Sequence, residues 1–135
     1  MAVARRRPVV EYFETFKASE NAALAAGAYE WSQGNGENTP MSAGIVVGVP
    51  SGYSAELISM GLSMQTGTAV VIAVIGGVEY PGAAQVTVTS PALTALDIMA
   101  TPTAVADGDT LNFKTRSASG TSGPNIVTMQ VRFYK

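Results

Sequence analysis

The stretch from residue 55 to residue 75 constrains the fold of this chain more than any other. Its first half, AELISMGLSM, alternates apolar residues with small or polar ones, which is the period of a strand with one buried face. The apolar residues on one side of this extended segment are Ile58, Met60, Leu62 and Met64. After the connector Gln65–Thr68 the pattern changes.

The run Ala69–Ile75 is apolar on both faces and consists mostly of residues that favour strands. It is too short to cross a bilayer, so protein must cover both of its faces. One face can meet the core of the domain, and the other needs an opposing segment of the chain or a neighbouring subunit. The run therefore indicates a β-sandwich that assembles with other protein, and it favours a homo-oligomer.

The composition supports an assembling protein. The chain has 135 residues, enough for one domain, and is 47% hydrophobic but only 13% charged. A typical soluble domain is about 25% charged. Much of the surface must therefore consist of Ser, Thr, Gly and Ala, which suits close contact with protein. The alternative is a monomer with a neutral surface.

The residue types argue against catalysis. The sequence has no His and no Cys, so it lacks the commonest general base, thiol nucleophiles and disulfides. A two-carboxylate glycosidase remains formally possible. However, Asp107-Gly108-Asp109 has the chemistry of a tight turn and offers too few oxygens for calcium. We expect no enzyme activity, no cofactor and no metal, and we find neither a secretory signal nor a transmembrane segment.

The charges are distributed unevenly along the chain. No basic residue lies between Lys17 and Lys114, and the acidic residues are concentrated in that middle part. An acidic body thus carries basic ends, which can steer association with an oppositely charged partner. The ends can equally fold back and neutralise the body.

Residues 1–17 are predicted to form an extended N-terminal arm, and residues 18–135 the β-sandwich domain. The part VVEYFETFK, residues 9–17, fits either an extended arm or an edge strand. The arginines of the arm have no interleaved aromatic residues, so we expect no nucleic-acid binding. We expect the arm to bind a partner through Arg5, Arg6, Arg7, Val9, Val10, Tyr12, Phe13 and Phe16.

The pattern of apolar and turn residues in the rest of the sequence predicts short strands separated by turns, without alternating helices. Strands are expected near residues 28–32, 45–49, 85–89, 96–100, 111–114 and 127–134. In the last of them, the residues expected to face inward are Val127, Met129, Val131 and Phe133. Trp31 is expected to fill the core. About eight strands in all predict an all-β fold, an antiparallel β-sandwich of the jelly-roll type.

Several segments of the sequence are similar to segments of a known class of protein. They are Val49–Tyr53, the strand Ala55–Met64, the valine-rich run that ends at Gly76-Gly77, residues 106–114 and the closing strand. Together they resemble small β-sandwich virion proteins of tailed bacteriophages, namely head decoration (cement) proteins and jelly-roll domains of tail and fibre proteins. The resemblance covers about Ile45 to Lys135.

The resemblance implies a location on the capsid surface and a homotrimer that clamps neighbouring copies of the major capsid protein, with no membrane partner. Such proteins act through surfaces, so it implies no catalytic or ligand residue. Because the chain begins with Met1 and is short, we expect a whole gene product, which favours decoration over a fibre fragment.

Two alternatives remain open. One is a carbohydrate- or receptor-binding module at a tail tip, in which Tyr29, Trp31, Tyr53 or Tyr80 would serve as stacking platforms. The other is a neck or tail-completion protein that joins the portal to the tail.

Overall fold

The computed structural model describes residues 10–28, 31 and 44–135, and all regular structure in these residues is β-strand. The strands are β1 (Glu11–Glu20), β2 (Ile45–Val46), β3 (Ser54–Ser63), β4 (Thr66–Ile75), β5 (Val78–Glu79), β6 (Gln85–Val88), β7 (Thr94–Val105), β8 (Thr110–Ser122) and β9 (Asn125–Tyr134). The absence of helix in this part of the chain agrees with the all-β prediction.

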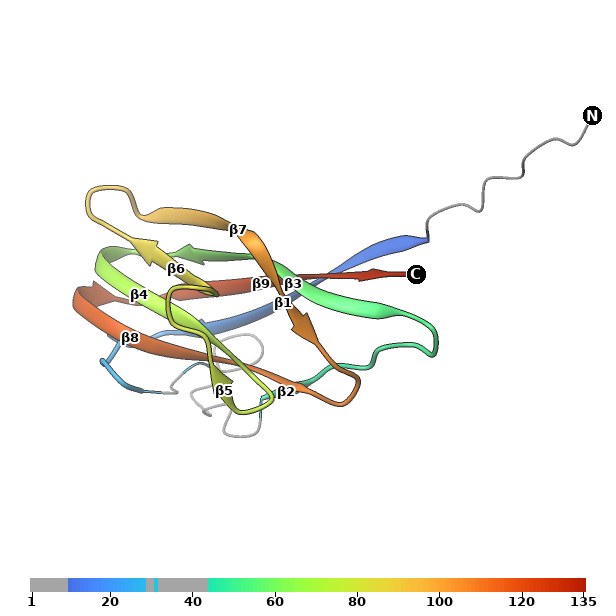
Figure 1. Cartoon of the computed structure of the whole chain (residues 1–135). Coiled ribbons are helices and arrows are strands. Elements are labelled where there is room, and N and C mark those ends of the chain that lie inside the picture. The colour runs from blue at the N-terminus through green and yellow to red at the C-terminus, as the bar shows by residue number, and fades with distance from the viewer. Residues whose placement is uncertain (1–9, 29–30, 32–43) are drawn as a thin grey trace, which may run out of the picture.

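The strands form two antiparallel sheets (Figure 1). Sheet A has the order β1-β9-β3-β7, and sheet B has the order β2-β8-β4-β5, with β6 also paired to β4. Four ladders join the first four strands to the last four: β1 with β9, β2 with β8, β3 with β7 and β4 with β6. This rolled-up hairpin of strands is the topology of a jelly roll, so the predicted fold class is confirmed. The described residues contain one more strand than the eight or so expected, because β5 adds a short hairpin to β4.

The inner faces of the two sheets supply the core. In β9 the predicted inward residues, Val127, Met129, Val131 and Phe133, are all fully buried. Leu111 and Phe113 of β8 and Val86 and Val88 of β6 are also buried, as their alternation with polar residues predicts.

A β-bulge in β3 corrects the predicted pattern at one residue. The ladder between β3 and β9 shifts at Ile58, because Leu57 pairs with Val131 and Ser59 pairs with Gln130. The extra residue reverses the alternation, so Leu57 faces the core before the bulge and Met60 faces it after the bulge. The sequence pattern predicted that Ile58 and Met60 share one face. In the structure Ile58 is only partly buried and does not share the face of Met60.

The chain itself covers both faces of the apolar run in β4. Val71 and Ala73 face the core between the sheets, while Ile72 and Val74, on the other face, are only 1% and 5% exposed. Ile72 lies in a hollow on that outer face whose other lining residues are Gly27, Glu79, Pro81, Lys114 and Arg116. A neighbouring subunit is therefore not needed here, and the argument for a homo-oligomer from this run loses its basis.

β1 is the edge strand of sheet A and runs beside β9 (Figure 1). It pairs along its whole length, from Glu11 opposite Tyr134 to Glu20 opposite Asn125. Of the two forms expected for this part of the chain, the edge strand is the one observed. The expected boundary between residues 17 and 18 cuts through β1 and is wrong for residues 11–17, which belong to the sandwich. Residues 1–9 lie outside the described residues.

The connector after β1 runs along the outer edge of β8. Gly27 N donates to Thr115 O, and Thr115 N donates to Ala28 O, so the connector takes the place of a strand where β2 ends. Of the strand expected at residues 28–32, only Ala28 and Trp31 are described, and neither lies in a strand.

Truncation tests the assignment of β1. Deleting residues 1–9 should leave the unfolding temperature unchanged. Deleting residues 1–17 should lower it by on the order of 10 °C, because it removes most of β1 and uncovers the side of β9 that Phe16 packs against. Thermal unfolding followed by circular dichroism measures both. Equal unfolding temperatures for the two truncated proteins would show that β1 is not part of the sandwich.

Candidate interaction surfaces

The outer face of sheet A carries a group of exposed large apolar side chains. Ile98 and Leu96 of β7 are 78% and 65% exposed, and Ile126 of β9 is 43% exposed. The sheet register brings them together, because Leu96 and Thr128 flank Gly61 on opposite sides. We call the outward-facing residues Leu96, Ile98, Ile126, Gly61, Ser59, Ser63, Thr94 and Thr128 the apolar face.

Gly61 makes a hollow in the apolar face. With no side chain between Leu96 and Thr128, a shallow depression of about 230 Å³ forms over β3. A Cβ placed on Gly61 would lie 2.6 Å from Thr128 Oγ1, so a larger residue would fill the hollow and displace its wall. The lining is almost entirely apolar, and none of its residues is charged.

Three charged residues, Arg132, Glu11 and Glu56, lie at the other end of the outer face of sheet A and bind one another. Arg132 Nε donates to Glu11 Oε2, and Arg132 Nη1 donates to Glu56 Oε1 at 2.9 Å. The hydrogen bond to Glu11, and then the one to Glu56, raise the pKa of the Arg132 guanidinium above its ordinary value. These contacts join β1, β9 and β3 at that end of the sheet, while Lys17 of β1 is exposed beside the apolar face, opposite Thr128.

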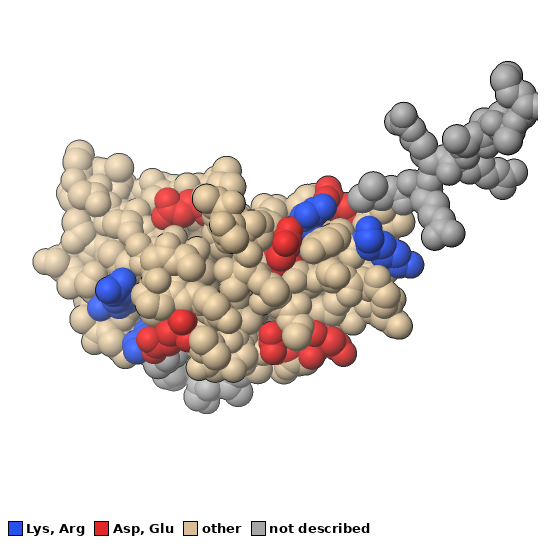
Figure 2. All heavy atoms as spheres, in the orientation of Figure 1, with Lys and Arg blue, Asp and Glu red and all other residues tan. Residues whose placement is uncertain are grey.

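Figure 2 shows that charged side chains form only a few small groups on the visible side of the molecule. Neutral residues cover most of that side, as the low charge content of the sequence implies. Among the described residues, no group of three or more Asp and Glu side chains has the arrangement of a metal site. No helix in that part of the chain is long and apolar enough to cross a membrane.

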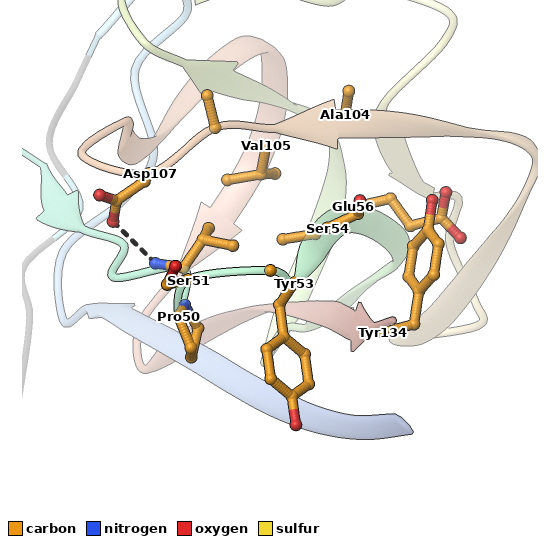
Figure 3. Close-up of a pocket in the computed structure, with 13 residues that line it drawn as sticks. Pro50, Ser51, Tyr53, Ser54, Glu56, Ala104, Val105, Asp107 and Tyr134 are labelled. Atoms are coloured by element: carbon orange, nitrogen blue, oxygen red, sulfur yellow. Dashed lines mark hydrogen bonds between the residues drawn. The ribbon is translucent and has the colours of Figure 1, made fainter. Parts of the chain in front are cut away.

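A larger, more polar hollow of about 680 Å³ opens at the end of the sandwich where the β7–β8 turn meets the segment before β3. Figure 3 shows Asp107 and Glu56 at opposite ends of it. Asp107 Oδ1 accepts from Val49 N at 2.8 Å, and Glu56 accepts from Arg132. Both carboxylates thus accept structural hydrogen bonds, and they do not face each other as a catalytic pair. The tight turn predicted at Asp107-Gly108-Asp109 is present, because Asp109 N donates to Ala106 O at 3.0 Å.

The structure divides the predicted partner-binding residues into three groups. Tyr12 and Phe16 face the core, and the Tyr12 ring stacks on Phe133 with centroids 4.8 Å apart. Val10 and Phe13 are exposed. The remaining four, Arg5, Arg6, Arg7 and Val9, lie outside the described residues.

The aromatic residues expected as stacking platforms offer little exposed surface to a sugar ring. Trp31 is 0% exposed, contacts Phe113 and donates from Nε1 to Thr115 Oγ1 at 3.1 Å, so it fills the core as predicted. Tyr53 meets Tyr12 edge-on, with the Lys135 ammonium 4.8 Å from its ring centroid. Tyr80 packs against the core, and Tyr29 lies outside the described residues.

The comparisons with known proteins add little. No protein-family model and no curated protein matches the sequence. One similar solved structure is described as the acidic stable capsid structure of Helicobacter pylori bacteriophage KHP30. The likeness covers 95% of this chain and 94% of that chain, with a TM-score of 0.49 and 11% identity. A likeness at this level carries no argument, so fold and function rest on the residues and geometry described above.

The sequence predicted a strand around Leu96 but did not predict the apolar face. On β7 the inward residues are Ala95, Asp97 and Met99, while the larger apolar residues Leu96 and Ile98 face solvent. Alternation alone predicts the opposite orientation, with the larger apolar residues inside. Only the register with β3, which places Leu96 beside Gly61, identifies the outward side.

The burial of Trp31 predicts a spectroscopic result. Its fluorescence emission should be shifted to the blue relative to free tryptophan, and oligosaccharides should leave the emission unchanged, because the indole ring has no exposed surface. Trp31 is the only tryptophan, so the signal comes from this site alone. Red-shifted emission that changes on titration with a sugar would contradict the assignment and support the carbohydrate-binding alternative.

Proposed function

We propose that this chain is a non-enzymatic structural protein of a tailed-phage virion that docks on other virion proteins through the apolar face of sheet A. The observation that supports this most directly is the grouping of Leu96, Ile98 and Ile126, exposed and uncharged, on one face. Monomeric proteins rarely leave large apolar patches open to water, so such a group marks an interaction surface.

The jelly-roll fold limits the functional classes to which the protein can be assigned. Jelly-roll sandwiches serve in viral capsids, lectins and cupins. A lectin function is less favoured, because Trp31, the largest candidate for stacking on a sugar, lies in the core. Catalysis would need a base or nucleophile other than His or Cys, since the sequence has neither. A structural role in a virion agrees with the neutral surface and with the resemblance of residues 45–135 to phage virion proteins.

The apolar face can supply the binding energy that docking requires. Fully burying one large aliphatic side chain contributes roughly 1.5–3 kcal/mol. Leu96, Ile98 and Ile126 together therefore offer several kcal/mol before the cost of association is subtracted. Exposed arginines contribute only about 0–1 kcal/mol each in surface ion pairs.

Within this role we favour a capsid decoration (cement) protein on the outside of the head, bound to neighbouring copies of the major capsid protein. The location, the partner and a homotrimeric state follow from the resemblance alone. The alternatives, a tail-tip module and a neck protein, differ in copy number. A neck protein forms a single ring, whereas a cement protein coats the whole head.

The N-terminal segment is a second docking element in this proposal. Val10 and Phe13 are exposed and available, and Arg5–Arg7 and Val9 precede them in the chain. Tyr12 and Phe16 are not available, because they pack against the core. Arg5, Arg6 and Arg7 changed together to Ala should therefore cause only a partial loss of docking, and that loss should be larger at low salt than at high salt.

Occupancy on phage particles tests the proposed role. Particles of the phage that carries this gene, prepared without the protein, are mixed with purified wild type or variants and sedimented. Ile126→Lys should reduce bound protein by about tenfold or more, because it places a charge in the contact. Val78→Lys is the matched control, since Val78 is also exposed and apolar but lies on β5 of sheet B. Unchanged binding of Ile126→Lys, or equal loss with Val78→Lys, would contradict docking through the apolar face.

A further inference from the structure

The outer edge of β7 presents unpaired backbone groups over Thr94–Ile98. Met64 N donates to Leu93 O at 2.8 Å, which makes this a hydrogen-bonded pair of the antiparallel ladder between β3 and β7. Such pairs alternate along a ladder, so Ala95 and Asp97 direct their N–H and C=O groups toward β3. The N–H and C=O groups of Thr94, Leu96 and Ile98 therefore point away from β3, toward the open edge of the sheet.

The same residues expose their side chains. Leu96 and Ile98 are the two large apolar residues of β7 that are most exposed, and both lie on the outer face of sheet A. The Asp97 side chain lies on the opposite face, where its Oδ2 accepts from Thr87 N of β6. This stretch thus combines open hydrogen-bonding groups with apolar side chains and has no charge on its outer face.

Natural edge strands are normally protected by charge, proline or covering segments. The later part of β7 contains Pro102, and β1 at the other edge of sheet A carries Glu11 and Lys17 on its outer face. In sheet B, β2 and the connector at Gly27 cover the edge of β8. Within the described residues, Thr94–Ile98 has no proline, no charge on its outer face and no strand hydrogen-bonded to its outer edge, which is the pattern of a strand that pairs with another strand.

We propose that Thr94–Ile98 pairs with the same segment of a second copy of this chain, antiparallel, about a two-fold axis at Leu96. In this register Leu96 faces Leu96 of the second copy, and Thr94 faces Ile98 on either side. All three residues direct their N–H and C=O groups outward, so three hydrogen-bonded pairs form. The segment is suited to such self-pairing because Thr94, Leu96 and Ile98 are all uncharged, so no like charges meet across the two-fold axis.

The contact also extends the apolar face. Leu96 and Ile98 of one copy continue into Leu96 and Ile98 of the next, so the outer faces of the two copies of sheet A form one surface. A two-fold contact closes at two copies and doubles the number of chains in whatever unit it joins. It does not depend on the proposed role in a virion, and it leaves Ile126 and the Gly61 hollow open for another partner.

Charge substitutions at the two-fold axis test this contact in purified protein. Leu96→Lys and Leu96→Glu each place like charges opposite each other, so each variant alone should weaken self-association by about tenfold or more and sediment with half the wild-type mass. A one-to-one mixture of the two variants should regain the wild-type mass, because Lys then faces Glu. Ile126→Lys adds the same charge to sheet A away from the edge and should keep the wild-type mass.

The mixing experiment distinguishes this register from self-association through a different surface. Wild-type mass for Leu96→Lys alone, or no recovery in the mixture of folded variants, would overturn the proposal. Should either charged variant lose its strand circular dichroism signal, Leu96→Pro serves instead, because it removes an N–H that points to the open edge and an exposed side chain, but no hydrogen bond of the ladder with β3. Its control is Thr15→Pro, whose N–H points to the open edge of β1. Halved mass for Leu96→Pro with unchanged mass for Thr15→Pro supports the pairing, and the same mass for both overturns it.

Discussion

Antiparallel pairing between the two halves of the chain is the constraint on which the rest of this structure depends. β9, the last strand, lies between β1 and β3 in sheet A and pairs with both. Its inward residues, from Val127 to Phe133, are fully buried and contribute to the core along its whole length. Sheet A is therefore incomplete until the end of the chain is in place, and most of the contacts that hold it join residues far apart in the sequence.

The two sheets differ in how far their faces and edges are covered by the rest of the chain. This difference decides which surfaces remain exposed. Sheet B covers its apolar strand β4 on both faces, and the connector at Gly27 and Ala28 closes the edge of β8. In the described residues, sheet A keeps β1 and β7 as its edges and leaves Leu96, Ile98 and Ile126 in contact with water. The surface that we propose for binding protein is on sheet A. Docking uses the side chains of its outer face and self-pairing uses the backbone edge of β7, and Leu96 and Ile98 take part in both.

The sequence predicted the fold class where local alternation and global burial agree. In β9, Val127 and Phe133 alternate with polar residues and face inward as predicted. The prediction failed at Ile58, because a bulge depends on the pairing partner and leaves no mark in the alternation. It also failed for the second face of Ala69–Ile75, because the residues that cover Ile72 come from distant segments such as Gly27 and Lys114.

The candidate site was harder to predict than the fold. The sequence directed attention to residues 1–17, but Tyr12 and Phe16 proved to be part of the core. Leu96 and Ile98 have the composition of buried residues, so only the cross-strand register identifies them as exposed. The alternation of residues shows that a strand has two different faces, but it does not show which face is buried. Exposed apolar residues on an edge strand therefore cannot be predicted from the alternation alone.

Residue-resolved amide hydrogen exchange of the dilute, isolated protein tests the central claim most directly, namely that sheet A includes β1 and is open at that edge. Lys135 N donates to Val10 O, so the amides of Tyr12, Glu14 and Phe16 point toward β9, while those of Phe13, Thr15 and Lys17 point away. The first set should exchange slowly and the second quickly. Fast exchange of both sets would show that β1 is not part of the sheet, and slow exchange of both would show that its edge is covered.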